Sequence, residues 1–274
     1  MKYWFLSFSL ALLFSPALGQ ITLTGTTQDV NTNQPVPYVN IGVLGKNIGT
    51  VSGPDGTFTL EIPEEYTQDT LKVSSIGYEA RLFLVANLAQ QLQSNPTLLM
   101  TPKVIELAEI MVKGDLPNTT VLGNRNHTEM VQVGFRGASL GHEVGIRYKV
   151  KHPDTFLKSF SGYILSNTSE SMRFRLNFYE VKKGWPGEKI VQQNIIISLN
   201  QEEGRFQIDL TPYNISMDED FFCTIELIEN LNEEEAIMFA GTFGGKKMPF
   251  RETSQGKWDT YRSFSLGFQI EAAY

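Results

Sequence analysis

Histidines are the residues best suited to a metal or proton-transfer site, and the chain has three of them, His127, His142 and His152. A zinc peptidase places a histidine and a glutamate, or two histidines, at a fixed spacing so that both reach one ion. Glu129 follows His127 by two positions, and Glu143 follows His142 directly. Neither pair has the required spacing. We therefore expect no metal and no cofactor, and we expect the histidines to lie in solvated loops.

Nucleophilic chemistry lacks a sequence signature as well. The chain contains no Gly-x-Ser-x-Gly turn to expose a serine and no glycine-rich phosphate loop before a helix. Cys223 is the single cysteine, and we expect it to be a buried thiol. The acidic run Asp218-Glu219-Asp220 lacks the alternating spacing of a calcium loop, so we expect a solvated turn. We predict no catalytic residue and no enzyme, with a hydrolase on a β-sandwich as the least favoured alternative.

Aromatic residues in loop contexts remain as candidates for binding. Trp185 lies within Lys-Gly-Trp-Pro-Gly, and Trp258 lies within Gly-Lys-Trp-Asp, closely followed by Tyr261 and Arg262. Flat rings beside polar groups can stack on the faces of sugars. We predict a ligand site from these four residues. The alternative, which is favoured for the two tryptophans, is that they pack over the ends of the fold.

Composition limits the possible partners and fold. The formal net charge of −7 over 274 residues argues against general binding to nucleic acid. The apolar share of 41% is sufficient for a globular core, and the length suggests one or two domains. A single cysteine cannot form an internal disulfide.

The N-terminus has the pattern of an export signal. Lys2 precedes an apolar run from Tyr3 to Phe14, and Ala17-Leu18-Gly19 forms a small-x-small cleavage site. The run is too short to span a membrane, and no cysteine follows the site to carry a lipid. We predict a signal peptide at residues 1–19, a mature chain that begins at Gln20, no transmembrane helix, and export.

The stretch from Pro35 to Tyr78 indicates strands. Val39, Ile41 and Val43 alternate with small or polar residues, and Phe58, Leu60 and Ile62 do the same. Gly53-Pro54-Asp55-Gly56 between the two runs is a turn sequence, so we predict a β-hairpin. Residues 87–95 are predicted as a polar excursion or one helical turn. Strands at Leu98–Met100 and Ile105–Val112 would complete a seven-stranded sandwich.

This part of the chain resembles the carboxypeptidase regulatory-like domain, a small transthyretin-like β-sandwich. The resemblance covers residues 21–112 and rests on Gly25, Pro35 to Val39, Gly49-Thr50, Asp55 to Phe58 and Ile76 to Tyr78. It implies an accessory domain of the kind found at the N-terminus of Bacteroidota envelope proteins. It transfers no active-site residue.

The second half is predicted as a separate jelly-roll-like β-sandwich. We assign residues 20–113 to the first domain, 114–128 to an extended linker open to proteolysis, and 129–274 to the second domain. Arg173, Arg175 and Asn177 alternate with Phe174, Leu176 and Phe178, as in a strand with one buried face. The segments 177–187 and 208–215 resemble an uncharacterised β domain that accompanies the first. The predicted strands are 156–165, 172–181, 194–199, 205–210, 221–229, 236–243 and 264–272.

The predicted function follows from these observations. We expect an exported, non-enzymatic cell-envelope protein that binds a glycan or an envelope protein, with the ligand site in the second domain. Periplasm, outer-membrane association and cell surface are all compatible locations, and the oligomeric state is left open. An alternative is a small outer-membrane β-barrel formed by the C-terminal half, because Phe264 to Tyr274 alternate perfectly and end in an aromatic residue.

Overall fold

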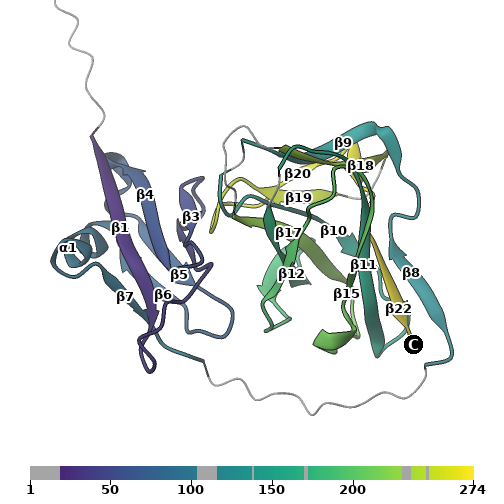
Figure 1. Ribbon diagram of the computed structural model, residues 1–274, viewed down its shortest axis with the longest axis horizontal. Coiled ribbons are helices and arrows are strands. Elements are labelled where there is room, and N and C mark those ends of the chain that lie inside the picture. Colours follow the sequence, from purple (N-terminus) through teal and green to yellow (C-terminus); the bar gives the residue numbers. More distant parts are fainter. Residues whose placement is uncertain (1–18, 104–115, 138, 170–171, 230–235, 245–246) are drawn as a thin grey trace, which may run out of the picture.

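The computed structural model describes residues 19–103, 116–137, 139–169, 172–229, 236–244 and 247–274. Most of the predicted signal peptide and the predicted strand Ile105–Val112 lie outside these ranges. Two β domains lie side by side (Figure 1). The prediction of an all-β chain with two β-sandwiches is confirmed.

The first domain contains two sheets that enclose one apolar core. A three-stranded sheet has the order β4-β1-β7, and a four-stranded sheet has the order β3-β2-β5-β6. The strands are β1 (Gln20–Asp29), β2 (Asn40–Val43), β3 (Gly49–Val51), β4 (Thr57–Pro63), β5 (Thr70–Ser74), β6 (Arg81–Leu84) and β7 (Thr97–Met100), with a short 3-10 helix at Glu64–Tyr66.

Two local predictions in this domain need correction. The turn at Gly53–Gly56 forms, with the Gly56 amide donating to the Gly53 carbonyl at 3.0 Å. The predicted hairpin does not form, because β4 crosses to the other sheet and pairs with β1. The predicted polar excursion is a full helix, α1 (Val85–Ser94), whose buried Val85, Leu88 and Leu92 share one face. In Figure 1, α1 lies on the side remote from the second domain.

The second domain packs a seven-stranded sheet against an eight-stranded sheet around one core. The first sheet has the order β13-β12-β17-β10-β19-β20, with β14 also paired to β12. Its strands are β10 (Glu143–Tyr148), β12 (Arg173–Lys182), β13 (Trp185–Lys189), β14 (Ile195–Ser198), β17 (Phe221–Glu229), β19 (Met248–Arg251) and β20 (Asp259–Tyr261).

The eight-stranded sheet has the order β21-β18-β11-β22-β8, with β15 and β16 also paired to β11 and β9 paired to β18. A second 3-10 helix spans Thr211–Tyr213. The strands are β8 (Thr119–Gly123), β9 (Thr128–Arg136), β11 (Thr155–Asn167), β15 (Gly204–Asp209), β16 (Ser216–Met217), β18 (Ala236–Phe243), β21 (Phe264–Leu266) and β22 (Gln269–Ala273).

Strand β8 lies inside the range 114–128 that we predicted as a linker. It pairs with β22 and buries Leu122 in the core, so the second domain includes residues from Thr119. The predicted strand 264–272 is divided in two, because β21 pairs with β18 whereas β22 pairs with β11 and β8. No helix in the described ranges is long and apolar enough to cross a membrane.

Candidate functional site

The outer face of the seven-stranded sheet carries buried charges. On β12, Phe174 and Phe178 point into the core, as predicted from their alternation. Arg175 and Asn177 point to the opposite face, where only 1% of each residue is exposed. The alternation therefore does not separate a buried face from a solvated one, because the first domain covers the polar side.

Two glutamates anchor this polar layer, and both are fully buried. Glu226 on β17 forms an ion pair with Arg175 at 3.3 Å, and Glu143 on β10 forms one with Arg251 at 2.5 Å. The amide of Asn177 donates to both glutamates at 2.8 Å. Burial raises the pKa of Glu226, but the charges of Arg175, Lys189 and Arg251 outweigh that effect and bring the pKa to about 2. The glutamate is thus held ionised.

The first domain adds hydrogen bonds to this layer. Asn40 on β2 accepts a hydrogen bond from Arg175 at 2.6 Å and donates to Glu226 and to the Ser254 hydroxyl. The Tyr38 carbonyl accepts a second bond from Arg175, and the Tyr38 hydroxyl donates to Glu229 at 2.8 Å. A buried charge with partners from both domains is costly to expose. The two domains are therefore coupled through this contact, which we call the polar interface.

A loop of the second domain lies against β2 and β3. A Cβ atom added at Gly42 or Gly49 would collide with the Ser254 carbonyl, so glycine at both positions permits the close approach. The Gly45 amide donates to the Gln255 carbonyl at 3.0 Å, and the Gln255 side chain donates to a first-domain hydroxyl. These contacts fix the loop that leads to Trp258.

Trp258 lies at the margin of the polar interface and is half-buried. Its ring meets the Tyr179 ring edge-on at 5.7 Å, and the Arg251 guanidinium lies 4.9 Å from its centroid. Lys189 approaches Tyr179 from β13, with its ammonium 3.9 Å from Glu226. Desolvation lowers the pKa of Lys189 to about 8, although Glu226 opposes that shift.

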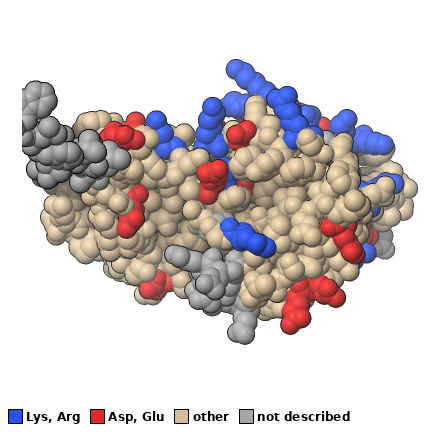
Figure 2. Space-filling view, turned by 90° about the horizontal axis from the view of Figure 1, so that it is seen from above, with Lys and Arg blue, Asp and Glu red and all other residues tan. Residues whose placement is uncertain are grey.

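Trp185 has a similar environment. It opens β13, is half-buried, and has the Lys247 ammonium 5.5 Å from its ring centroid. Trp185 pairs with Lys182, which shares a strand face with Phe178, whereas Trp258 meets Tyr179 on the opposite face of β12. Figure 2 shows Lys and Arg side chains gathered along one margin of the second domain.

Tyr261 and Arg262 do not join Trp258, although they follow it closely in the sequence. Tyr261 stacks on Phe250 at 4.5 Å and on Phe264 at 5.3 Å, at the end of the core, with 45% of the residue exposed. It pairs with Met248, a core residue, and so lies on the opposite face from Arg251. Arg262 is exposed. The structure thus does not gather the four predicted site residues into one site.

The remaining chemical candidates have structural roles. His127 and His152 lie exposed in loops, as predicted, and each ring stacks on a tyrosine, His127 on Tyr163 at 5.3 Å and His152 on Tyr274 at 3.9 Å. The third, His142, meets a phenylalanine edge-on. Asp220 forms an ion pair with a neighbouring arginine at 2.8 Å. Burial raises the pKa of the Cys223 thiol well above its ordinary value. The described residues contain no group of His, Cys, Asp and Glu able to hold a metal ion.

The polar interface was missed from the sequence. Asn177 was interpreted as facing solvent, Glu143 was considered only beside His142, and Thr224 and Glu226 lie in the predicted strand 221–229 without an assigned role. One signal was available, since charged and apolar residues alternate through most of a ten-residue strand, β12, that also carries two arginines. That pattern does not reveal a second covering domain.

Comparison with known proteins defines the first domain. Residues 23–112 match the family model described as CarboxypepD_reg-like domain. The chain therefore contains a carboxypeptidase regulatory-like domain. The described β1 to β7 lie within or next to that match, in agreement with the resemblance found in the sequence.

Two solved structures show a distant similarity to this chain. It resembles the cysteine protease and lectin-like domains of Cwp84 from Clostridium difficile, with a TM-score of 0.41 and 10% identity over 59% of this chain and 37% of that one. It resembles a structure of infectious bursal disease virus, with a TM-score of 0.29 and 8% identity over 92% of this chain and 59% of the other. A search of the curated proteins found no match.

Proposed function

We propose that this chain is an exported, non-enzymatic cell-envelope protein of the Bacteroidota type that binds a glycan through its second domain. The carboxypeptidase regulatory-like domain serves as an accessory unit that covers the polar interface and holds the Trp258 loop. Its presence supports an envelope location, either periplasmic, outer-membrane-associated or on the cell surface.

The use of charged groups within the fold supports a non-enzymatic role. The buried glutamates Glu143 and Glu226 are both engaged by arginines and amides of the protein itself. A general base needs a free lone pair within reach of a substrate proton. The buried Cys223 has a raised pKa, which disfavours the reactive thiolate.

The observation that supports the glycan proposal is that two half-buried indole rings each lie against a cationic side chain. Trp185 lies against Lys247, and Trp258 lies against Arg251. Such a ring keeps one orientation and offers its remaining surface to a flat apolar sugar face. The neighbouring cations can donate hydrogen bonds to hydroxyl or carboxylate groups.

A glycan array probed with the protein from Gln20 to Tyr274 tests this proposal. We expect binding to at least one glycan, weakened about tenfold or more in Trp185→Ala and Trp258→Ala. Phe243→Ala is the matched control, since Phe243 is an aromatic residue with 62% exposure on the other sheet. Circular dichroism must show that each variant is folded. Unchanged binding by folded tryptophan variants would contradict the proposal.

Export is tested by cell fractionation with N-terminal sequencing. We expect a mature chain that begins at Gln20 in an envelope or external fraction. Recovery of an uncleaved chain from the cytoplasm would contradict the predicted export.

A further inference from the structure

The open edge of β8 is the strongest unassigned feature of the second domain. β8 is the last strand of its sheet and, among the described residues, pairs only with β22. The Tyr274 amide donates to the Asn118 carbonyl at 3.1 Å, and the Asn124 amide donates to the Phe268 carbonyl at 3.1 Å. Antiparallel strands alternate the direction of their backbone groups. Thr119 and Val121 therefore direct their amide and carbonyl groups away from β22, toward the open edge.

The edge has few of the features that normally prevent strand addition. Edge strands are commonly blunted by charged residues, proline or bulges. The β8 sequence Thr-Thr-Val-Leu-Gly contains no charge and no proline, three of its five residues are β-branched, and its pairing with β22 has no bulge. Val121 is 37% exposed although Leu122 beside it is buried. The strand is thus held by the core on one face and open along its edge.

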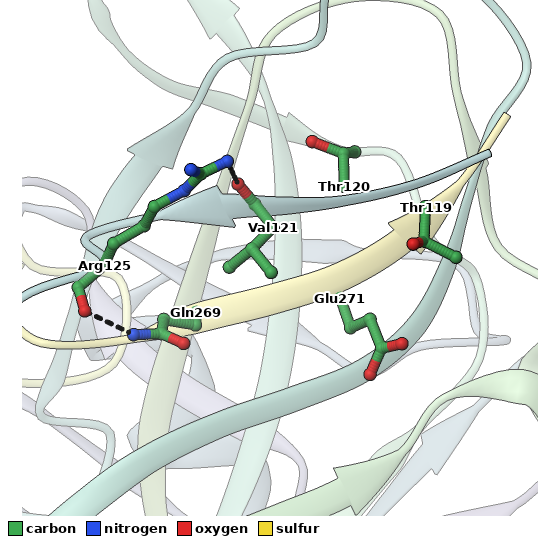
Figure 3. Close-up of a pocket in the computed structure, with 6 residues that line it drawn as sticks. All are labelled: Thr119, Thr120, Val121, Arg125, Gln269 and Glu271. Atoms are coloured by element: carbon green, nitrogen blue, oxygen red, sulfur yellow. Dashed lines mark hydrogen bonds between the residues drawn. The ribbon is translucent and has the colours of Figure 1, made fainter.

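A shallow depression of about 450 Å³ adjoins this edge, lined by β8, β22 and Arg125 (Figure 3). The Arg125 guanidinium turns back to the Val121 carbonyl at 3.4 Å, a long hydrogen bond. The Gln269 amide donates to the Arg125 carbonyl at 3.0 Å and fixes the backbone there. Among the described residues, no carboxylate lies within ion-pair distance of Arg125. The guanidinium is therefore available to form an ion pair with an acidic group of a partner.

We propose that β8 binds an extended segment of a partner protein as an added strand, with an acidic side chain of that segment meeting Arg125. Only another polypeptide backbone supplies donors and acceptors at the repeat that an open strand edge presents. Arg125 adds charge complementarity beside the edge. This surface is separate from the tryptophans and does not depend on the glycan proposal.

Selection of short random displayed peptides against the protein from Gln20 to Tyr274 tests the proposal. We expect enriched peptides to contain a carboxylate and alternating β-branched residues. Their affinity should fall about tenfold or more in Val121→Pro and in Arg125→Glu. Val121→Pro removes an amide that points to the open edge and leaves the bonds to β22 in place. Arg205→Glu, on β15 of the same sheet, is the matched charge control.

Two further measurements separate strand addition from other modes of binding. N-methylation of every second peptide amide should abolish binding when the methylated amides are those that face β8. It should spare binding when they are the other amides, because an added strand bonds to β8 through only one of the two sets. Failure to enrich any peptide, equal affinity for folded Val121→Pro, or no effect of either methylation phase would overturn the proposal. A wild-type dimer that Val121→Pro converts to monomer would also overturn it, since a second copy would then occupy the edge.

Discussion

Glu226 shows how a single residue links the two domains. It is fully buried and accepts hydrogen bonds from Arg175, Asn177 and the first-domain residue Asn40. Removing one partner of a buried pair leaves the other charge without compensation. We expect Glu226→Gln to lower the free energy of unfolding by about 3 to 5 kcal/mol in urea titrations.

Glu180→Gln is the matched control for that variant. Glu180 has an exposed side chain and lies 4.0 Å from Lys182, so its loss should cost less than about 1 kcal/mol. Equal losses of unfolding free energy in the two variants would show that Glu226 is solvated and that the domains are not closely docked.

Lys189 gives the polar interface a dependence on pH. Burial lowers its pKa from 10.5 to about 8, so the unfolded chain binds this proton over a range in which the folded chain has released it. The free energy of unfolding therefore gains a contribution that rises with pH between about 8 and 10.5, of roughly 3 kcal/mol. The wild-type value minus the Lys189→Met value should rise across this window in urea titrations. A flat or falling difference would show that Lys189 is solvated.

At the scale of elements, β2 and β3 act as the docking edge of the first domain. An alanine in place of Gly42 would direct its Cβ into the Ser254 carbonyl. Gly42 does not have a positive φ, so the substitution adds no backbone strain of its own. We expect Gly42→Ala to destabilise the protein by about 1 to 3 kcal/mol, because the loop must move away.

Gly187→Ala is the control for this effect. The nearest neighbours of its Cβ would be side-chain atoms of Glu180 and Lys182 and no backbone atom, so we expect a smaller adjustment than that of the Ser254 loop. Thermal unfolding of the two variants compares them directly. A larger loss for Gly187→Ala than for Gly42→Ala would show that the loop contact at Ser254 is loose.

The sequence predicted individual elements better than their pairing. Alternation identified β2, β4 and β12, because a strand directs successive side chains to opposite faces and so leaves a period of two. It did not show that β4 joins β1, because a turn sequence fixes a reversal of the chain and not the sheet to which the next strand belongs. α1 was underestimated because its polar residues outnumber the three that it buries.

At the scale of the whole molecule, the first domain could be recognised from local motifs and the interface could not. Turn glycines and strand alternation lie within one domain and are visible in one stretch of sequence. The polar interface joins Asn40 to Arg175 and Glu226, which are more than a hundred residues away. Polar residues on a strand usually face solvent, so their burial depends on a docking partner that the pattern does not contain.

The central claim is that the two domains form one unit through the polar interface, although the sequence alone predicted two separable folding units. Differential scanning calorimetry of the protein from Gln20 to Tyr274 tests it most directly. Tight coupling predicts one endotherm whose calorimetric and van't Hoff enthalpies agree. Two resolved endotherms, one of them insensitive to Glu226→Gln, would contradict the claim.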